Sequence, residues 1–321
     1  MISDALQEKI EHAYDVLKLA AKMSKLYYQK PLIITYSGGK DSDVMLQLAI
    51  ECLNSEDFEV INSHTTVDAP ETVYYIRERF TALREHGIIA TVLYPTYKDG
   101  SFKSMWNLIV KNGMPPTRLI RYCCNELKET STPNRFVAVG VREDESTIRR
   151  GRDDFNVIGK KKSDALYYSF SHIKDVFSQS ERERERVHAQ PNDADVYDCK
   201  FIEKAKNKNS IRCNPIYTFS ENDVWTFIHD RKMKYNPLYD RGYHRIGCIG
   251  CPLGGSKSQL KEFADFPKYK KLYLMAFDRM IKENKKESSK INNFKNAQQV
   301  YDWWTNSIYG QMTIQDFLKG E

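Results

Sequence analysis

The sequence lacks the features of a membrane or secreted protein. Its 321 residues contain no apolar run that approaches the roughly 20 residues needed to span a bilayer. The first five residues begin a polar amphipathic helix rather than a secretion signal, which predicts a cytoplasmic protein with no membrane partner. Internal repeats and low-complexity tracts are absent too, so the chain is expected to fold as an ordinary globular protein.

Cysteine is scarce, and charge of one sign is not extreme. Seven cysteines in a chain without an export signal argue against a disulfide framework and favour thiols kept for metal, cluster or redox chemistry. The formal net charge of +6 fits a nucleic-acid partner and an anion-binding enzyme equally well, so the charge alone does not decide between them.

The most informative run is Ser37-Gly38-Gly39-Lys40-Asp41-Ser42, here called the glycine loop. It follows the apolar segment 32–36 and precedes the helix-compatible segment 43–50, so strand, glycine turn and helix are expected. Two glycines let the backbone approach an oxyanion, and Ser42 or Asp43 is expected to cap a helix whose N–H groups attract phosphate. An ordinary strand-to-helix turn is the structural alternative.

The spacing of the glycine loop narrows the nucleotide chemistry. It lacks the two distant glycines of the G-x-x-x-x-G-K-[ST] loop and is not G-x-G-x-x-G, which weakens kinase-type and dinucleotide-binding interpretations. The run resembles the PP-loop of the adenine nucleotide α-hydrolase superfamily. The resemblance implies either cleavage of ATP between its α and β phosphates or binding of an adenylyl sulfate.

Helical and strand-like segments alternate along the first part of the chain. Helices are expected over 5–28 and 70–85, and strands over 59–63, 88–94 and 136–141. This order predicts an α/β, Rossmann-like fold with a mainly parallel sheet, whose ligands bind at the carboxyl ends of the strands. Besides the glycine loop, the segments 64–69 and 140–146 follow such ends.

Composition suggests three parts. Residues 1–148 are expected to form the nucleotide-binding core, 149–212 a charged surface insertion, and 213–321 a part that completes the core. Within the insertion, alternating Glu and Arg over 180–186 indicate a solvated helix more than a nucleic-acid contact. The last part is expected to be extended at 215–217 and helical at 221–230, 267–287 and 296–305, with Val300, Trp303 and Trp304 in the core.

Four cysteines form two close pairs. Cys123 and Cys124 are adjacent, and Cys248 and Cys251 form a C-x-x-C. Such pairs suit either tetrahedral zinc or a four-iron four-sulfur cluster, because both take thiolate ligands, and ligand count does not separate them. In an alternative arrangement Cys199 and Cys213 join the C-x-x-C pair and leave the tandem pair as a redox dithiol. Cys52, in the loop helix, is interpreted as a buried core thiol.

Together these segments resemble the phosphoadenosine-phosphosulfate (PAPS) and adenylyl-sulfate reductase family. The resemblance runs over about 32–255, apart from the insertion. It is carried in order by the tandem cysteines, Gly140-Val141-Arg142 with Glu145-Ser146, Asn214-Pro215-Ile216 with Asp223-Val224-Trp225, and the stretch from Asn236 to Cys251. The cysteine pattern is that of the cluster-bearing branch, which implies that Cys123, Cys124, Cys248 and Cys251 ligate a 4Fe-4S cluster.

The resemblance does not settle the reaction. Reductases of this family attack sulfur with a cysteine near the C-terminus, and no cysteine follows Cys251 here. The expected activity is therefore that of an ATP pyrophosphatase acting in sulfur incorporation onto nucleic acid, similar to the DNA phosphorothioation enzymes. One alternative is a PAPS or adenylyl-sulfate reductase that takes its thiol from Cys199, Cys213 or another protein. Another is a nucleotide-sensing or nucleic-acid-binding subunit with little turnover.

The expected partners are an adenine nucleotide, a sulfur donor such as a cysteine desulfurase or thioredoxin-like protein, nucleic acid, and a second copy of the chain as a homodimer. In the site, backbone N–H groups of Ser37, Gly38 and Gly39 would hold the β and γ phosphates, and Lys40 would neutralise the leaving pyrophosphate.

Further roles are expected for the polar side chains. Asp41 would bind Mg²⁺, and Ser42 would hold a phosphate oxygen. Asp68 would face the nucleotide or its metal, and Arg142 and Arg149 would contact the anionic group of the substrate. A capping role for Asp68 and surface ion pairs for the two arginines are the alternatives.

Overall fold

The computed structural model describes residues 2–118, 120–129, 132, 134–145, 155–157, 211–283 and 294–306. Arg149, Cys199 and most of the predicted 149–212 insertion lie outside the described residues. The chain divides into two compact units. The first comprises Met1–Asn62, Tyr74–Leu93 and Thr132–Gly242, and the second comprises Ser63–Val73, Tyr94–Ser131 and Tyr243–Glu321.

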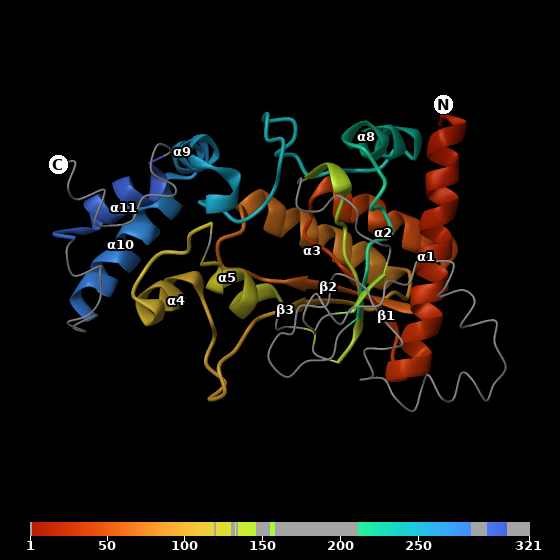
Figure 1. Cartoon of the computed structure of the whole chain (residues 1–321), viewed down its shortest axis with the longest axis horizontal. Helices are drawn as coiled ribbons and strands as arrows, with labels where there is room; N and C mark the ends of the chain where they lie inside the picture. The colour runs from red at the N-terminus through yellow and green to blue at the C-terminus, as the bar shows by residue number, and fades with distance from the viewer. Residues whose placement is uncertain are drawn as a thin grey trace, which may run out of the picture. The chain divides into compact units, whose positions relative to one another are not determined.

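The first unit is built around a six-stranded sheet (Figure 1). Its strands are β1 (Leu32–Thr35), β2 (Phe58–Ser63), β3 (Ala90–Leu93), β4 (Phe136–Ala138), β5 (Phe155–Val157) and β6 (Ile211–Cys213), in the spatial order β3-β2-β1-β4-β6-β5. β1 pairs in parallel with β2 and β4, and β4 with β6, whereas β5 is antiparallel to β6. The predicted α/β class with a mainly parallel, Rossmann-like sheet is confirmed.

Apolar runs place β1 at the centre of the core. Leu32, Ile33 and Ile34 are all fully buried, as expected for a strand covered on both faces. The helices of this unit are α1 (Asp4–Tyr28), α2 (Lys40–Cys52), α8 (Glu221–Asp230) and the greater part of α3 (Pro70–Glu85). α1 contacts β1 and β4 and buries an apolar stripe at helical spacing, which confirms its prediction as a packing helix.

Sequence periodicity located most elements but not all. The bounds of α3 and α8 are those predicted, and the predicted strands agree with β1 to β4 within a few residues. The prediction for 215–217 was wrong: these residues form a turn, in which Tyr217 N–H donates to the Asn214 carbonyl. β6 was not predicted, and neither was β5, which lies within the predicted insertion.

The second unit is mainly helical. It contains α4 (Met105–Asn112), α5 (Tyr122–Cys124), α9 (Ser256–Asp265), α10 (Pro267–Glu283) and α11 (Ala297–Thr305). α10 contacts α4, α9 and α11 (Figure 1). Aromatic rings form the core: Trp304 lies 4.8 Å from Tyr273 and 5.9 Å from Phe263, between ring centroids, and its indole N–H donates to the Pro116 carbonyl. The prediction of Val300, Trp303 and Trp304 as core residues is confirmed.

Three of the described helices of this unit, α4, α9 and the short α5, had not been predicted. Among the described helices of both units, none is both long enough and apolar enough to cross a membrane.

Candidate functional site

The glycine loop has the strand, turn and helix form that the sequence predicts. Gly38 takes a left-handed φ of +73°, which favours glycine, and α2 begins at Lys40. The prediction of the cap was wrong. Gly39 is the N-cap in place of Ser42 or Asp43, and its carbonyl accepts the Asp43 N–H. The N–H groups of Asp41 and Ser42 therefore lie in the first turn of α2, where helices attract anions, whereas the Lys40 N–H is taken by the Tyr239 hydroxyl.

The two serines of the loop bond to the loop itself. The Ser42 hydroxyl donates to the Gly39 carbonyl at 2.7 Å and accepts the Ser37 N–H at 3.3 Å. The Ser37 hydroxyl lies 3.3 Å from the Ser42 hydroxyl. These bonds give Ser42 a role in shaping the turn, while its predicted contact with a phosphate oxygen stays a prediction.

Gly140, which follows β4, lies against the first turn of α2. A Cβ at position 140 would be 3.2 Å from the carbonyl carbon and oxygen of Asp41 and 3.3 Å from the Ser42 nitrogen. These distances are below ordinary van der Waals contact with rigid backbone atoms. The absence of a side chain at Gly140 thus lets the segment that carries Arg142 pass close to the glycine loop.

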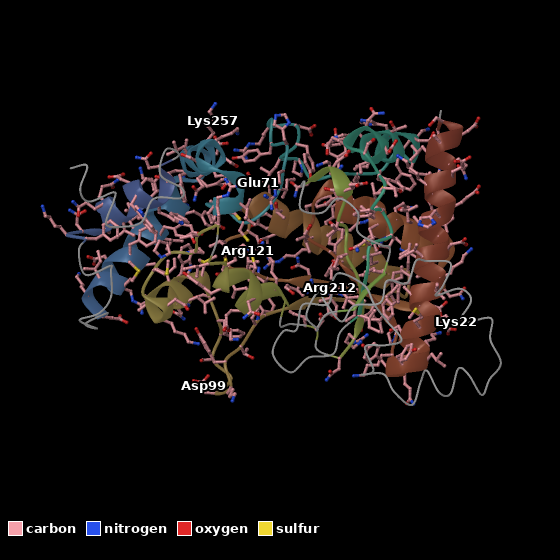
Figure 2. The ribbon with its side chains drawn as sticks, viewed as in Figure 1. Lys22, Glu71, Asp99, Arg121, Arg212 and Lys257 are labelled. Atoms are coloured by element: carbon pink, nitrogen blue, oxygen red, sulfur yellow. The ribbon has the colours of Figure 1, made fainter. Side chains whose placement is uncertain are left out.

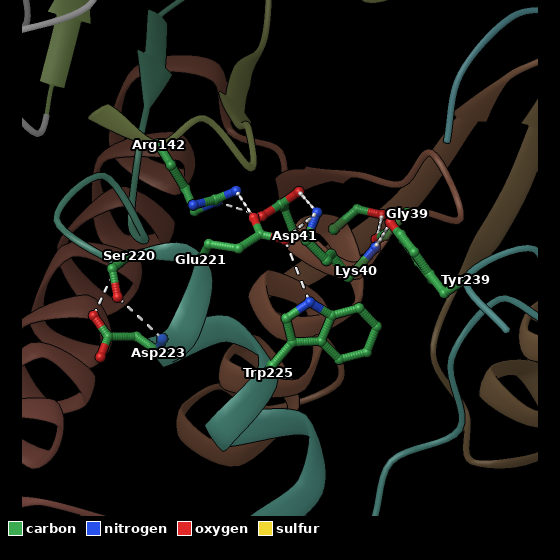
Figure 3. A network of polar contacts seen from close by, with 10 residues as sticks. Gly39, Lys40, Asp41, Arg142, Ser220, Glu221, Asp223, Trp225 and Tyr239 are labelled. Carbon is green, nitrogen blue, oxygen red and sulfur yellow. Dashed lines mark hydrogen bonds and ion pairs between the residues drawn. The ribbon is translucent and has the colours of Figure 1, made fainter. Parts of the chain in front are cut away.

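Four charged side chains meet beside the loop (Figure 3). Arg142 donates from Nε to Asp41 Oδ1 at 2.5 Å and from Nη2 to Glu221 Oε2 at 2.6 Å. Lys40 Nζ lies 3.3 Å from Glu221 Oε1 and 3.6 Å from Asp41 Oδ2. The structure therefore brings together all three predicted catalytic residues, Lys40, Asp41 and Arg142, with a fourth that had not been predicted, Glu221.

The two cations of this network, Lys40 and Arg142, are buried, whereas the carboxylate of Glu221 is exposed. Lys40 and Arg142 are each 4% exposed, whereas the Glu221 side chain is 54% exposed. Arg142 Nη1 is buried and, among the residues that the structure describes, has no hydrogen-bond partner. A buried donor without an acceptor is uncommon in folded proteins, and here it leaves the guanidinium able to bind a further oxyanion.

Three more residues that support the loop were missed by sequence reasoning. The Tyr239 hydroxyl accepts the Lys40 backbone N–H at 2.9 Å, and Asn236, which is fully buried, donates to the Gly38 carbonyl at 3.1 Å. Trp225 donates from Nε1 to Glu221 at 3.3 Å, and its ring meets that of Tyr239 edge-on at 5.1 Å (Figure 3). Their segments are among those that carry the family resemblance, so the sequence holds a signal for them, but it does not indicate a contact with the glycine loop.

A buried acid lies one residue beyond the loop. Asp43 is 1% exposed and accepts a hydrogen bond from the Tyr36 hydroxyl. Burial raises the pKa of Asp43 from 3.8 to about 7, against the lowering effect of its hydrogen bonds.

The four cysteines predicted as ligands all belong to the second unit. Cys123 and Cys124 lie on α5, and Cys248 and Cys251 flank a tight turn in which Cys251 N–H donates to the Cys248 carbonyl. At the turn, Gly250 has a φ of +75°, and a Cβ there would come within 2.5 Å of the Phe263 ring. Gly250 therefore seats the C-x-x-C turn directly on the aromatic core.

The sulfur atoms influence one another electrostatically. A hydrogen bond to Cys124 and burial raise the pKa of Cys123, with further effects from Cys248 and Cys251. The hydrogen bond from Cys123 lowers the pKa of Cys124 to about 6, helped by the charges of Lys128, Arg121 (labelled in Figure 2) and Arg245. Burial raises the pKa of Cys248 to about 11. We call these cysteines the four-thiol set.

Basic side chains surround the four-thiol set. The thiolate of Cys248 is the main cause that raises the pKa of Lys128, with smaller effects from Asp68, Cys124 and Cys251. Four soft sulfur donors with nearby positive charge fit the chemistry of a thiolate-bound cluster. Within the described parts of the chain, no three Cys, His, Asp or Glu side chains are arranged to hold a single metal ion.

Asp68 belongs to the second unit rather than to the unit of the glycine loop. Its carboxylate accepts the Thr65 N–H at 2.9 Å and lies 3.7 Å from His64 Nδ1, and its backbone forms a bridge with Cys248. These contacts hold Asp68 to the loop that precedes α3 and are not a helix cap, so its capping alternative and its predicted contact with the nucleotide both stay predictions.

The remaining cysteines in the described ranges lie in the first unit. Cys213, on β6, is fully buried in the core around β1 and α2, and Cys52 is partly buried against the same core. This placement gives no support to the alternative in which Cys213 joins the C-x-x-C pair. Arg149 and Cys199 lie outside the described residues.

Comparison with known proteins adds a family match. Residues 31–253 match the family model described as the phosphoadenosine phosphosulfate reductase domain. An uncharacterized protein of Methanocaldococcus jannaschii is 23% identical over 286 residues, which are 87% of this chain and 55% of that protein. The chain thus spans about half the length of this relative. An adenosine 5'-phosphosulfate reductase of Anoxybacillus flavithermus is 41% identical over 51 residues, 16% of this chain and 22% of that one.

Solved structures resemble the chain more distantly. The phosphoadenylyl-sulfate reductase of Candida auris, in a phosphate complex, aligns with a TM-score of 0.41 and 15% sequence identity. The alignment covers 77% of this chain and 96% of that one.

Proposed function

Because the chain belongs to the phosphoadenosine phosphosulfate reductase family, we propose that its first unit binds ATP at the glycine loop and cleaves it to AMP and pyrophosphate. One observation carries this proposal. Lys40 and Arg142, two buried cations, lie beside the open first turn of a helix that starts in a glycine turn. Backbone N–H groups and fixed positive charge at one place are what a polyphosphate requires.

Each residue of the network has a role in this reaction. The N–H groups at the start of α2 bind phosphate oxygens, and Lys40 stabilises the negative charge that develops on the leaving pyrophosphate. Arg142 holds a second phosphate oxygen through its unpaired Nη1. Asp41 binds the Mg²⁺ that accompanies ATP, and Arg142 orients its carboxylate through Nε.

The four-thiol set would hold a 4Fe-4S cluster in the second unit. Its residues fit such a group because they are four thiols with neighbouring cationic side chains, which offset the negative charge of thiolate ligands. When bound, the cluster supplies an iron site for sulfur chemistry. The hydrogen bond from Cys123, followed by the charges of Lys128, Arg121 and Arg245, lowers the pKa of Cys124, which favours the thiolate form that a ligand requires.

The wider function follows from this pair of sites. We propose that nucleotide cleavage drives sulfur incorporation into nucleic acid, with the sulfur taken from a cysteine desulfurase or a thioredoxin-like protein. This proposal follows from the resemblance of the core motifs to those of the DNA phosphorothioation enzymes. A nucleic-acid acceptor and a homodimer remain parts of the proposal to be tested by binding and by sedimentation.

The test is product analysis on the full chain reconstituted with iron and sulfide under anaerobic conditions. ATP with Mg²⁺ should yield AMP and pyrophosphate in equal amounts, and Lys40→Ala should lower the rate by roughly a hundredfold or more. Lys234→Ala is the matched control, because the Lys234 side chain is 79% exposed and its ion pair, within the described residues, is with the surface residue Glu78. Near-normal pyrophosphate release by Lys40→Ala would refute the assignment.

A reductase is the second candidate, favoured by the family match and by the segment shared with an adenosine 5'-phosphosulfate reductase. Against it, these 321 residues contain no cysteine after Cys251 to attack the bound sulfonucleotide. Sulfite release from adenylyl sulfate with thioredoxin, without pyrophosphate release from ATP, would select the reductase.

A further inference from the structure

We propose that Glu221 is an internal competitor for the phosphate site: its carboxylate neutralises Lys40 and Arg142 and must leave them before the nucleotide binds. This inference rests on the proposed function and adds to it a residue that sets nucleotide affinity. Glu221 is a positioning residue here, since it acts through the two cations and not on the reacting atoms.

The contacts of Glu221 are those of a bridging anion. Oε2 accepts from Arg142 Nη2 at 2.6 Å, and Oε1 lies 3.3 Å from Lys40 Nζ. Oε1 also accepts from Trp225 Nε1 at 3.3 Å, which fixes the carboxylate between the two cations (Figure 3). One carboxylate thus occupies Arg142 Nη2 and contacts Lys40 Nζ, on the two cations that the proposed function assigns to phosphate.

Glu221 is not needed to start its own helix. Ser220 is the N-cap of α8 and accepts the Asp223 N–H at 3.1 Å, while Asp223 accepts the Ser220 N–H at 2.8 Å in return. Asp223 also pairs with Lys9 at 2.7 Å. Since this capping box already fixes the helix start, the Glu221 side chain can move without unwinding α8.

Exposure favours exchange with an anion from solution. The Glu221 side chain is 54% exposed, whereas those of Lys40 and Arg142 are 5% and 4% exposed. The carboxylate can therefore rotate into water, where it is well solvated, while the cations stay in place. The unpaired Nη1 of Arg142 gives an incoming phosphate a donor that Glu221 does not use.

Charge determines the direction of the effect. Lys40 and Arg142 contribute two positive charges to the network, and Asp41 and Glu221 contribute two negative ones, so the network is neutral. Glu221→Gln leaves one net positive charge and retains an oxygen for Trp225. We therefore expect the variant to bind polyphosphate more tightly, because the nucleotide no longer displaces an ionised partner.

The experiment is calorimetric titration of the full chain with inorganic pyrophosphate without Mg²⁺ and with ATP in the presence of Mg²⁺. Glu221→Gln should bind pyrophosphate about threefold to tenfold more tightly than the wild type. In turnover, KM for ATP should fall by a similar factor with kcat changed less than about threefold. Glu221→Asp, which keeps the charge on a shorter side chain, should fall between the two and covers the case in which the amide variant folds poorly.

Glu78→Gln is the matched control, since it removes an exposed ion pair with Lys234 in the same unit. Unchanged or weaker pyrophosphate binding by Glu221→Gln would overturn the inference. Weaker binding of ATP only when Mg²⁺ is present would also overturn it, because Glu221 would then be a metal ligand. Lys40→Ala distinguishes a failure of the Glu221 inference from a failure of the proposed function. If that variant binds pyrophosphate as tightly as the wild type, the proposed phosphate site is wrong.

Discussion

The hydroxyl of Tyr239 accepts the backbone N–H of Lys40 at 2.9 Å, and the Lys40 ammonium lies 5.3 Å from the centroid of the same ring. One aromatic side chain thus contacts both the main chain and the side chain of the residue on which the proposed chemistry depends. Its neighbour Asn236 holds the Gly38 carbonyl, so the segment 236–239 buttresses the glycine loop.

Tyr239→Phe separates the contribution of the hydroxyl's hydrogen bond from that of the aromatic ring. The variant keeps the aromatic face toward Lys40 but leaves the N–H without its acceptor, so the free energy of unfolding should fall by about 0.5–1.5 kcal/mol. Urea unfolding at neutral pH measures this change. Tyr235→Phe is the control, because the Tyr235 hydroxyl, within the described part of the chain, donates to the exposed Asp240 at 3.1 Å, and the expected change is near zero. Equal losses in both variants would argue against a supporting role for Tyr239.

Gly140→Ala tests the close approach of the β4 segment to the loop. The new Cβ would meet backbone atoms of Asp41 and Ser42 at 3.2 and 3.3 Å, and rigid backbone cannot give way as a side chain can. We expect a loss of about 1–3 kcal/mol in the free energy of unfolding, as for other overpacked sites. Nucleotide binding should weaken too, because Arg142 would move away from Asp41.

Gly247→Ala is the control for the glycine substitution. Among the described residues other than its two chain neighbours, no atom lies within 4 Å of a Cβ at that position, and its φ is not in the left-handed region. Its unfolding free energy should stay within about 0.5 kcal/mol of the wild type. A Gly140→Ala protein as stable as this control would show that the segment can shift without cost.

Sequence patterns were sufficient for most of the strands and helices and for the glycine loop. The parallel sheet followed from the alternation of apolar strands and helices, and the glycine loop from its position after β1. The sequence did not predict roles for Glu221 and Tyr239, because these roles depend on contacts with Lys40. Glu221 and Tyr239 follow Lys40 by 181 and 199 residues in the sequence. Periodicity carries no information about such pairs.

The cap of α2 shows a different limit. Ser42 and Asp43 are good N-cap types, so propensity favoured them, but the Gly39 carbonyl accepts the Asp43 N–H and the helix starts earlier. Asp43 is then carried inside the helix and into the core, where Tyr36 is its partner. Tertiary burial overrode the local preference.

Buried Asp43 makes stability depend on pH. Burial raises its pKa to about 7 from 3.8, so between these values the folded state binds more protons than the unfolded state. The contribution of Asp43 is therefore fully present below about pH 4 and is lost as pH rises through about 7. Asp43→Asn removes this titration. From about pH 5 to about pH 8, the free energy of unfolding should fall more in the wild type than in the variant. Parallel pH profiles of the two proteins would contradict the raised pKa.

If the four-thiol set binds a 4Fe-4S cluster, each of its cysteines is needed to retain iron and sulfide. Replacing Cys123, Cys124, Cys248 or Cys251 singly by serine removes one soft ligand, and hard hydroxyl oxygen is a poor substitute for thiolate at iron. Each variant, reconstituted anaerobically, should lose most of the iron and acid-labile sulfide that the wild type holds, together with its visible absorption. In the wild type, iron and sulfide should be present in about equal amounts, as in a 4Fe-4S cluster.

Cys52→Ser is the matched control, because Cys52 lies on α2 in the first unit and is partly buried against its core. It should keep the wild-type iron and sulfide content, whatever it loses in stability. If zinc is retained in place of iron and sulfide, the set is a zinc site. If the Cys52 variant loses iron as the others do, the loss reports unfolding rather than a missing ligand, because a half-buried thiol outside the four-thiol set has no means of holding the cluster.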